Sequence, residues 1–154
     1  MTLAFEKLLA PAIGSRKPAD IDSPPSRLHV AVVFTSASET IVALRKAGAL
    51  ADSLGACVAL LVPQVVPYPL PLESPPVLLD FSERRFAEIA KESPVETIVR
   101  IYLCRDRQET ILGILNPHSI VVVGCRKRWW PTQEKRLARQ LRRAGHEVIF
   151  TETE

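Results

Sequence analysis

Two kinds of segment alternate along most of this chain, and their alternation restricts the fold more than any other feature. Short apolar runs rich in Val, Ile and Leu are typical of strands that are buried on both faces. Such runs lie at residues 28–35, 56–63, 95–105, 119–124 and 146–151. Segments with helical spacing of apolar residues separate them, at residues 36–55, 77–93, 106–116 and 132–145. This order predicts an α/β fold with a five-stranded, doubly wound, mainly parallel sheet and helices on both faces.

The ends of the predicted helices carry capping residues. Ser36 and Glu39 have the spacing of a capping box, and Gly55 suits the left-handed conformation that ends many helices. Asp106 and Thr132 stand at the N-cap positions of two later helices. These signals place two helix starts directly after the strands at 28–35 and 95–105, and a third after the loop that follows the strand at 119–124.

The predicted strand at residues 95–105 differs from the others because polar residues alternate along it. Glu96, Arg100 and Tyr102 share one face, which predicts an edge strand partly exposed to water. The helix before it should contact the core through Phe81, Phe86 and Ile89. We expect the strand at 28–35 to be central in the sheet, and the strand at 146–151 to lie at an edge.

Residues 1–26 form a separate N-terminal arm or tether in this interpretation, and residues 27–154 form the α/β domain. The segment LAFEKLLAPAI predicts a short amphipathic helix that ends at Pro11. GSRKPADIDSPPS is typical of a flexible tether. A docking or disordered arm is favoured over a membrane anchor, since the helix is short and not strongly basic. Six prolines between Pro63 and Pro76 predict an extended loop.

Composition narrows the class of protein. The chain of 154 residues is 47% hydrophobic and 24% charged, as in ordinary soluble globular proteins. Three cysteines without a C-x-x-C pair indicate neither a disulfide framework nor a zinc site. No segment is typical of a membrane span or a signal peptide, so a cytoplasmic protein is expected. A net charge of +3 does not point to a nucleic-acid partner, and none is expected.

The positive charge is concentrated near the C-terminal end. Between Arg126 and Arg143, Glu134 is the single acid among eight basic residues. The basic residues are Arg126, Lys127, Arg128, Lys135, Arg136, Arg139, Arg142 and Arg143. Such a cluster favours anions, although a solvated helix face next to a basic loop would have the same sequence.

Several segments resemble the universal stress protein family. The resemblance covers about residues 28–151 and rests on ALRKAGALADSLGA, SLGACVALLVP, SIVVVGCR and LARQLRRAGHEVIF. It implies an α/β sheet and a homodimer formed through the last strand, and it implies ATP binding in one branch of the family. FTSASET also resembles the start of the stress-protein-like module of potassium-sensing histidine kinases, some of which bind a cyclic dinucleotide.

The ATP-binding branch of the family has a pattern that this chain matches only in part. The resemblance implies an acidic residue after the first strand, where Thr35 stands, and an apolar residue at the end of the second, where Val62 fits. It also implies Gly-x-x-Gly after the fourth strand, where Gly124 matches the first glycine and Lys127 stands at the position of the second. A Gly-Ser or Gly-Thr pair should follow, but no further glycine occurs before Gly145. Because glycines let backbone amides approach a phosphate, we expect neither tight ATP binding nor a bound cofactor.

The residues after the fourth strand offer a substitute for the glycines. Arg126, Lys127 and Arg128 could neutralise an anion, and Trp129 or Trp130 could stack on a base. The candidate ligand-binding residues are therefore Thr35, Ser36, Val62, Gly124, Arg126, Lys127 and Arg128. The alternative is that the basic residues are solvated and the tryptophans pack on the proline-rich loop or on a neighbouring subunit.

The sequence contains no recognisable catalytic or metal-binding set, and we expect no enzyme activity. His29, His118 and His146 have no evident partners, and Cys125 is more simply a small residue at a strand end than a thiol with a lowered pKa. Two main hypotheses remain, with a weak ATPase as a third alternative. The first is a regulatory stress-response protein that acts through dimerisation and through binding of a protein or ligand. The second is a sensor of ATP, AMP or a cyclic dinucleotide with an altered phosphate loop.

Overall fold

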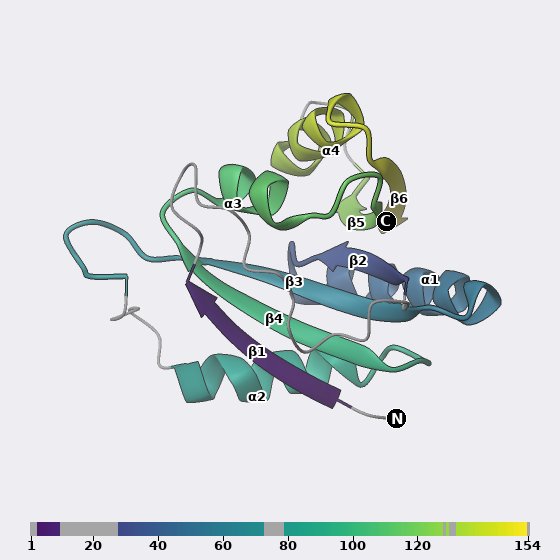
Figure 1. Cartoon of the computed structure of the whole chain (residues 1–154), viewed down its shortest axis with the longest axis horizontal. Helices are drawn as coiled ribbons and strands as arrows, with labels where there is room; N and C mark the ends of the chain where they lie inside the picture. Colours follow the sequence, from purple (N-terminus) through teal and green to yellow (C-terminus); the bar gives the residue numbers. More distant parts are fainter. Residues whose placement is uncertain (1–2, 10–27, 73–78, 128, 130–131, 154) are drawn as a thin grey trace.

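The computed structural model describes residues 3–9, 28–72, 79–127, 129 and 132–153. Six parallel strands form one sheet in the order β1-β4-β3-β2-β5-β6 (Figure 1). The strands are β1 Leu3–Leu9, β2 His29–Val33, β3 Cys57–Val65, β4 Thr97–Cys104, β5 Ile120–Arg126 and β6 Glu147–Thr153. The helices are α1 Ala37–Leu54, α2 Leu79–Ala90, α3 Arg107–Ile114 and α4 Gln133–Arg143. The predicted doubly wound parallel sheet is confirmed, with one strand more than the sequence indicated.

Alternate residues of the central strand face two separate cores. Val30 and Val32 of β2 pack in one core with α1 and α2. Ala31 and Val33 pack in the other core with α3 and α4. This burial on both faces explains the continuous apolar runs of the inner strands, and it confirms that β2 is central between β3 and β5.

The prediction of a helix at the N-terminal end of the chain was wrong. Leu3–Leu9 forms β1, which pairs in parallel with β4 from Leu3 opposite Thr97 to Leu9 opposite Leu103 (Figure 1). A helix of this length is marginal in water by itself, whereas the edge of β4 offers hydrogen-bond partners for the backbone groups of alternate residues of an extended segment. The flexible tether predicted at residues 14–26 lies outside the described residues.

The prediction that the strand at 95–105 lies at the edge was wrong for the same reason. Because β1 covers it, β4 is an inner strand, and Tyr102 is buried. The strand at the other edge is β6, as expected. In addition, β3 continues through Pro63 to Val65, so the prediction that the proline-rich loop begins at Pro63 was wrong, and the loop begins at Val66.

The expected contacts of α2 are confirmed in part. Phe86 and Ile89 are buried in the core, whereas Phe81 is 61% exposed. Phe81 precedes Phe86 by five residues, and a helical turn takes 3.6 residues, so the two side chains point to different sides of the helix.

The predicted helix caps are confirmed. The side chains of Ser36, Asp106 and Thr132 accept hydrogen bonds from the backbone N–H groups three residues later, at 3.4, 2.8 and 3.3 Å. Gly55 ends α1 with a φ of 65°, in the left-handed region that favours glycine. These caps fix where α1, α3 and α4 begin, at the carboxyl-end edge of the sheet. Within the described residues, no helix has the length and apolar character that a membrane span requires.

Candidate functional site

The loops that follow β2 and β5 meet at the carboxyl end of the sheet, where ligands bind in many folds of this type. The hydroxyl of Thr35 donates a hydrogen bond of 3.0 Å to the carbonyl oxygen of Gly124. The sheet therefore brings Thr35 and Ser36 next to Gly124, as the sequence predicted from the order of the strands.

Gly124 has a packing role at this junction. A Cβ atom built on Gly124 would lie 2.2 Å from the carbonyl oxygen of Glu39 and 2.7 Å from its carbonyl carbon. The first turn of α1 thus occupies the space above β5 that the missing side chain leaves. This glycine is required for helix packing whether or not a phosphate binds nearby.

Thr35 and Ser36 also serve the local structure. The backbone N–H of Thr35 donates to the Oγ1 of Thr40 at 3.1 Å, and Ser36 caps α1. Thr40 is completely buried. The polar groups at the end of β2 are therefore engaged with one another and with β5.

The remaining candidate residues of this region differ in burial. Val62 is 2% exposed and packs in the core beneath α1. Arg126 and Lys127 are exposed at the end of β5, and the N–H of Lys127 extends the ladder by donating to the carbonyl of Thr153 at 2.9 Å. Trp129 is 91% exposed. Arg128 and Trp130 lie outside the described residues.

Arg107, which was not among the predicted site residues, reaches the same end of the sheet from α3. Its guanidinium donates to the carbonyl oxygen of Phe34, directly after β2. Burial lowers the pKa of Arg107, and the charge of Glu134 opposes that shift. The only sequence signal for this role was the position of Arg107 directly after the N-cap Asp106.

Cys125 is a buried residue of β5. Burial raises the pKa of its thiol, and the neighbouring carboxylate of Glu152 raises it further. The thiol is thus not activated, which agrees with the simpler interpretation of Cys125. Within the described part of the chain, no three His, Cys, Asp or Glu residues cluster as a metal site would require.

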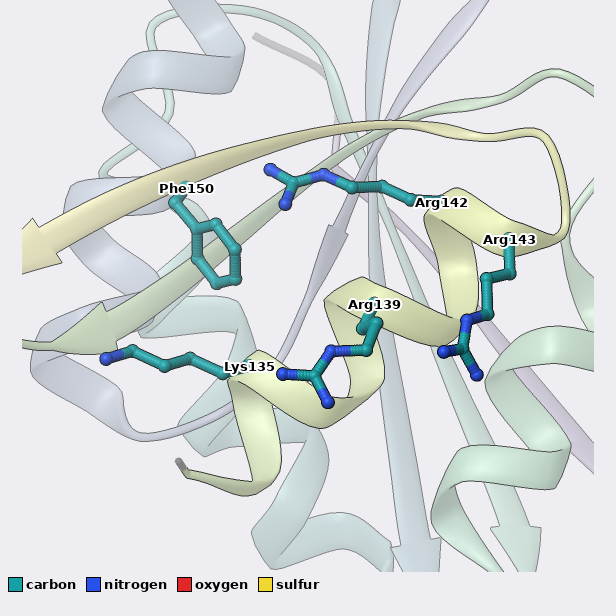
Figure 2. A pocket seen from close by; sticks show the side chains of 5 residues that line it. All are labelled: Lys135, Arg139, Arg142, Arg143 and Phe150. Atoms are coloured by element: carbon teal, nitrogen blue, oxygen red, sulfur yellow. The ribbon is translucent and has the colours of Figure 1, made fainter. Parts of the chain in front are cut away.

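A second candidate region is a groove between α4 and β6. In Figure 2 the side chains of Lys135, Arg139 and Arg142 of α4 extend toward the side on which Phe150 of β6 lies, and Arg143 lies at the far end of the helix. The hollow measures about 490 Å³, and its lining residues are Lys135, Arg139, Arg142, Arg143 and Phe150. The sequence indicated the cluster of charge but neither the groove nor the part of Phe150 in it. We refer to these five residues as the basic groove.

Arg142 connects the two walls of the basic groove. Its guanidinium carbon lies 5.4 Å from the centre of the Phe150 ring, and its Nη2 donates to the carbonyl oxygen of Val148 at 3.4 Å. Within the described residues, Arg139 and Arg143 form no ion pair with an acidic side chain. The groove therefore concentrates positive charge beside the free edge of the sheet.

Comparison with known proteins supports the fold. No model of a known protein family matches the chain, and neither does any curated protein. Among solved structures, the chain is similar to a universal stress protein from Archaeoglobus fulgidus, with a TM-score of 0.58 and 16% sequence identity. The match covers 80% of this chain and 92% of that one. The chain has the fold of a universal stress protein.

The universal stress protein fold agrees with the resemblance noted in the sequence. At 16% identity the structural match establishes the fold alone. The roles of individual residues in this chain therefore have to be argued from their own contacts, above all those of Gly124 and of the basic groove.

Proposed function

We propose that this chain is a regulatory stress-response protein that acts through homodimerisation and through binding of a protein or ligand. In this proposal it neither catalyses a reaction nor binds ATP tightly. The observation that carries the proposal is the environment of Gly124, whose missing side chain accommodates the carbonyl of Glu39. Packing thus accounts for the one glycine that remains of the phosphate pattern.

Dimerisation is supported by the position of β6. This strand lies at the edge of the sheet and pairs only with β5 among the described strands. An exposed edge offers free backbone N–H and C=O groups, and proteins generally cover such groups or use them for association. A second copy of the chain could cover them with closed two-fold symmetry.

A nucleotide sensor remains the second candidate function. The exposed positions of Arg126 and Lys127 and the exposed ring of Trp129 favour it. In that case side chains would bind the phosphate and the base in place of glycine amides. The ligand would be ATP, AMP or a cyclic dinucleotide.

Titration with nucleotides distinguishes the two functions. The protein as purified is first analysed by mass spectrometry for bound small molecules, and is then titrated with ATP, AMP and cyclic dinucleotides by calorimetry and tryptophan fluorescence. We expect an empty protein without saturable binding below millimolar ligand. Stoichiometric nucleotide, or saturable quenching that a Trp129→Phe variant abolishes, would overturn the proposal in favour of the sensor.

A further inference from the structure

The free edge of β6 has a defined set of backbone groups that turn away from β5. The N–H of Glu147 donates to Ser119, and the carbonyl of Thr153 accepts from Lys127, so the odd-numbered residues of β6 turn their backbone groups toward β5. Because successive residues of a strand alternate in direction, Val148, Phe150 and Glu152 turn theirs outward. The hydrogen bond from Arg142 to the carbonyl of Val148 agrees with this direction.

The same three residues direct their side chains to the α4 side of the sheet. Val148 and Phe150 pack in the core that contains Leu137 and Leu141 of α4. In the parallel register, Phe150 lies opposite Val123 and Glu152 lies opposite Cys125. Glu152 therefore projects on the side of the sheet that carries the basic groove.

The length of β6 selects a register for pairing with a second copy. The strand has seven residues, and Phe150 is the middle one. Antiparallel pairing in which Phe150 faces Phe150 of the second copy uses the whole strand and closes with two-fold symmetry. In this register Val148 lies opposite Glu152 of the second copy, and residues that lie opposite each other point to the same side.

This register brings opposite charges together. Arg142 already reaches the carbonyl of Val148, which is the position that Glu152 of the second copy would face. Glu152 is exposed, and Arg139 and Arg143 of the same groove have no acidic partner among the described residues. The carboxylate of the incoming strand would thus meet a guanidinium, and symmetry makes the pair reciprocal.

We infer that the basic groove receives Glu152 of a second copy, and that reciprocal Arg142–Glu152 pairs fix the antiparallel register of the β6–β6 interface. This inference rests on the proposed homodimer and names the side chains that determine its geometry. The two phenylalanine rings face each other across the two-fold axis, and aromatic cross-strand pairs stabilise such an arrangement. The interface should weaken as salt is added, because the pairs lie near the surface.

A charge swap tests the inference. The dimer dissociation constant is measured by sedimentation velocity for the wild type, for Arg142→Glu, for Glu152→Arg and for the double variant. Each single variant should weaken the dimer about tenfold, since it converts two attractive pairs into repulsive ones, and the double variant should recover the wild-type value. Arg136→Glu and Glu147→Arg are matched controls, because Arg136 does not line the groove and Glu147 points to the opposite side of β6.

The outcomes separate the inference from the dimer on which it rests. A dimeric wild type whose single variants dimerise equally well would overturn the charge pairing and leave the dimer in place. A monomeric wild type would overturn both the charge pairing and the homodimer. If an extended Glu-rich peptide bound to that monomer, the basic groove would be a site for a segment of another protein. Circular dichroism shows whether charge reversal disturbs folding. In that case Arg142→Gln and Glu152→Gln replace the reversed variants, and each should weaken the dimer by a smaller factor.

Discussion

The carboxyl ends of β2 and β5 and the free edge of β6 both offer polar groups, but they differ in how those groups are used. At the strand ends, Thr35 bonds to Gly124 and to Thr40, and α1 fills the space over the glycine. At the edge, the outward backbone groups of β6 face away from β5, and the basic groove concentrates positive charge next to them. Groups that are engaged inside the fold stabilise it, whereas groups without internal partners are available to a second molecule.

In the proposed function, the two regions have different roles. At the strand ends, Gly124 and the hydroxyls of Thr35 and Thr40 serve the packing of α1 on the sheet. The edge of β6 has backbone groups that can form hydrogen bonds with another strand, and the basic groove beside it carries positive charge. This combination suits a partner segment that is extended and acidic.

The largest expected effect tests the packing role of Gly124. Gly124→Ala would place a methyl group 2.2 Å from the carbonyl of Glu39, which cannot move without shifting α1. We expect a loss of about 3 kcal/mol in the free energy of unfolding, measured with urea. Gly113→Ala is the matched control, because nothing lies within 4 Å of its added methyl group.

The control should be neutral or stabilise α3 by up to about 1 kcal/mol, since alanine favours a helix over glycine. If Gly124→Ala were as stable as the wild type, α1 would not depend on this glycine. The contrast between the two regions would then fail, and the nucleotide sensor would regain support.

A smaller expected effect is the pH dependence of stability, which we attribute to His146 at the start of β6. The N–H of Ser119 donates to the Nδ1 of His146, directly before β6, at 3.1 Å. Burial lowers the pKa of His146 from its usual 6.5, and the charge of His118 lowers it further. Protonation would replace this acceptor with a donor, so the native state binds the proton less readily than the unfolded state.

The sign of the pH dependence follows from this difference. The contribution of His146 to stability is complete above pH 6.5 and is lost as the pH falls through the lowered pKa. A His146→Asn variant should therefore show a flatter dependence of the urea midpoint between about pH 7.5 and about pH 5 than the wild type. Equal slopes would mean that the contact to Ser119 does not govern the acid response of this edge.

The fold was predictable from the sequence to the extent that its signals are local. The buried runs of β2, β3 and β5 and the caps at Ser36, Asp106 and Thr132 each lie within a few residues of the element they define. The strand β1 was missed because its partner β4 lies some ninety residues further along the chain. That missing pairing also made β4 appear to be an edge strand.

The candidate sites show the same limit. The sequence indicated that Thr35 and Gly124 would lie together, since strand order alone implies it. It could not show that Glu39 occupies the space over Gly124, or that Phe150 lines the basic groove, because both contacts depend on tertiary packing. Arg107 was overlooked because an arginine in the first turn of a helix is unremarkable until its carbonyl partner is known.

Amide hydrogen exchange of β6 tests most directly whether the free edge is the interaction surface. The amide of Ile149 points toward β5 and serves as an internal reference, whereas the amide of Phe150 points outward. At a concentration that favours the dimer, we predict protection of both amides, with the protection of Phe150 lost on dilution. An amide of Phe150 that exchanges freely at every concentration, beside a protected Ile149, would contradict the account.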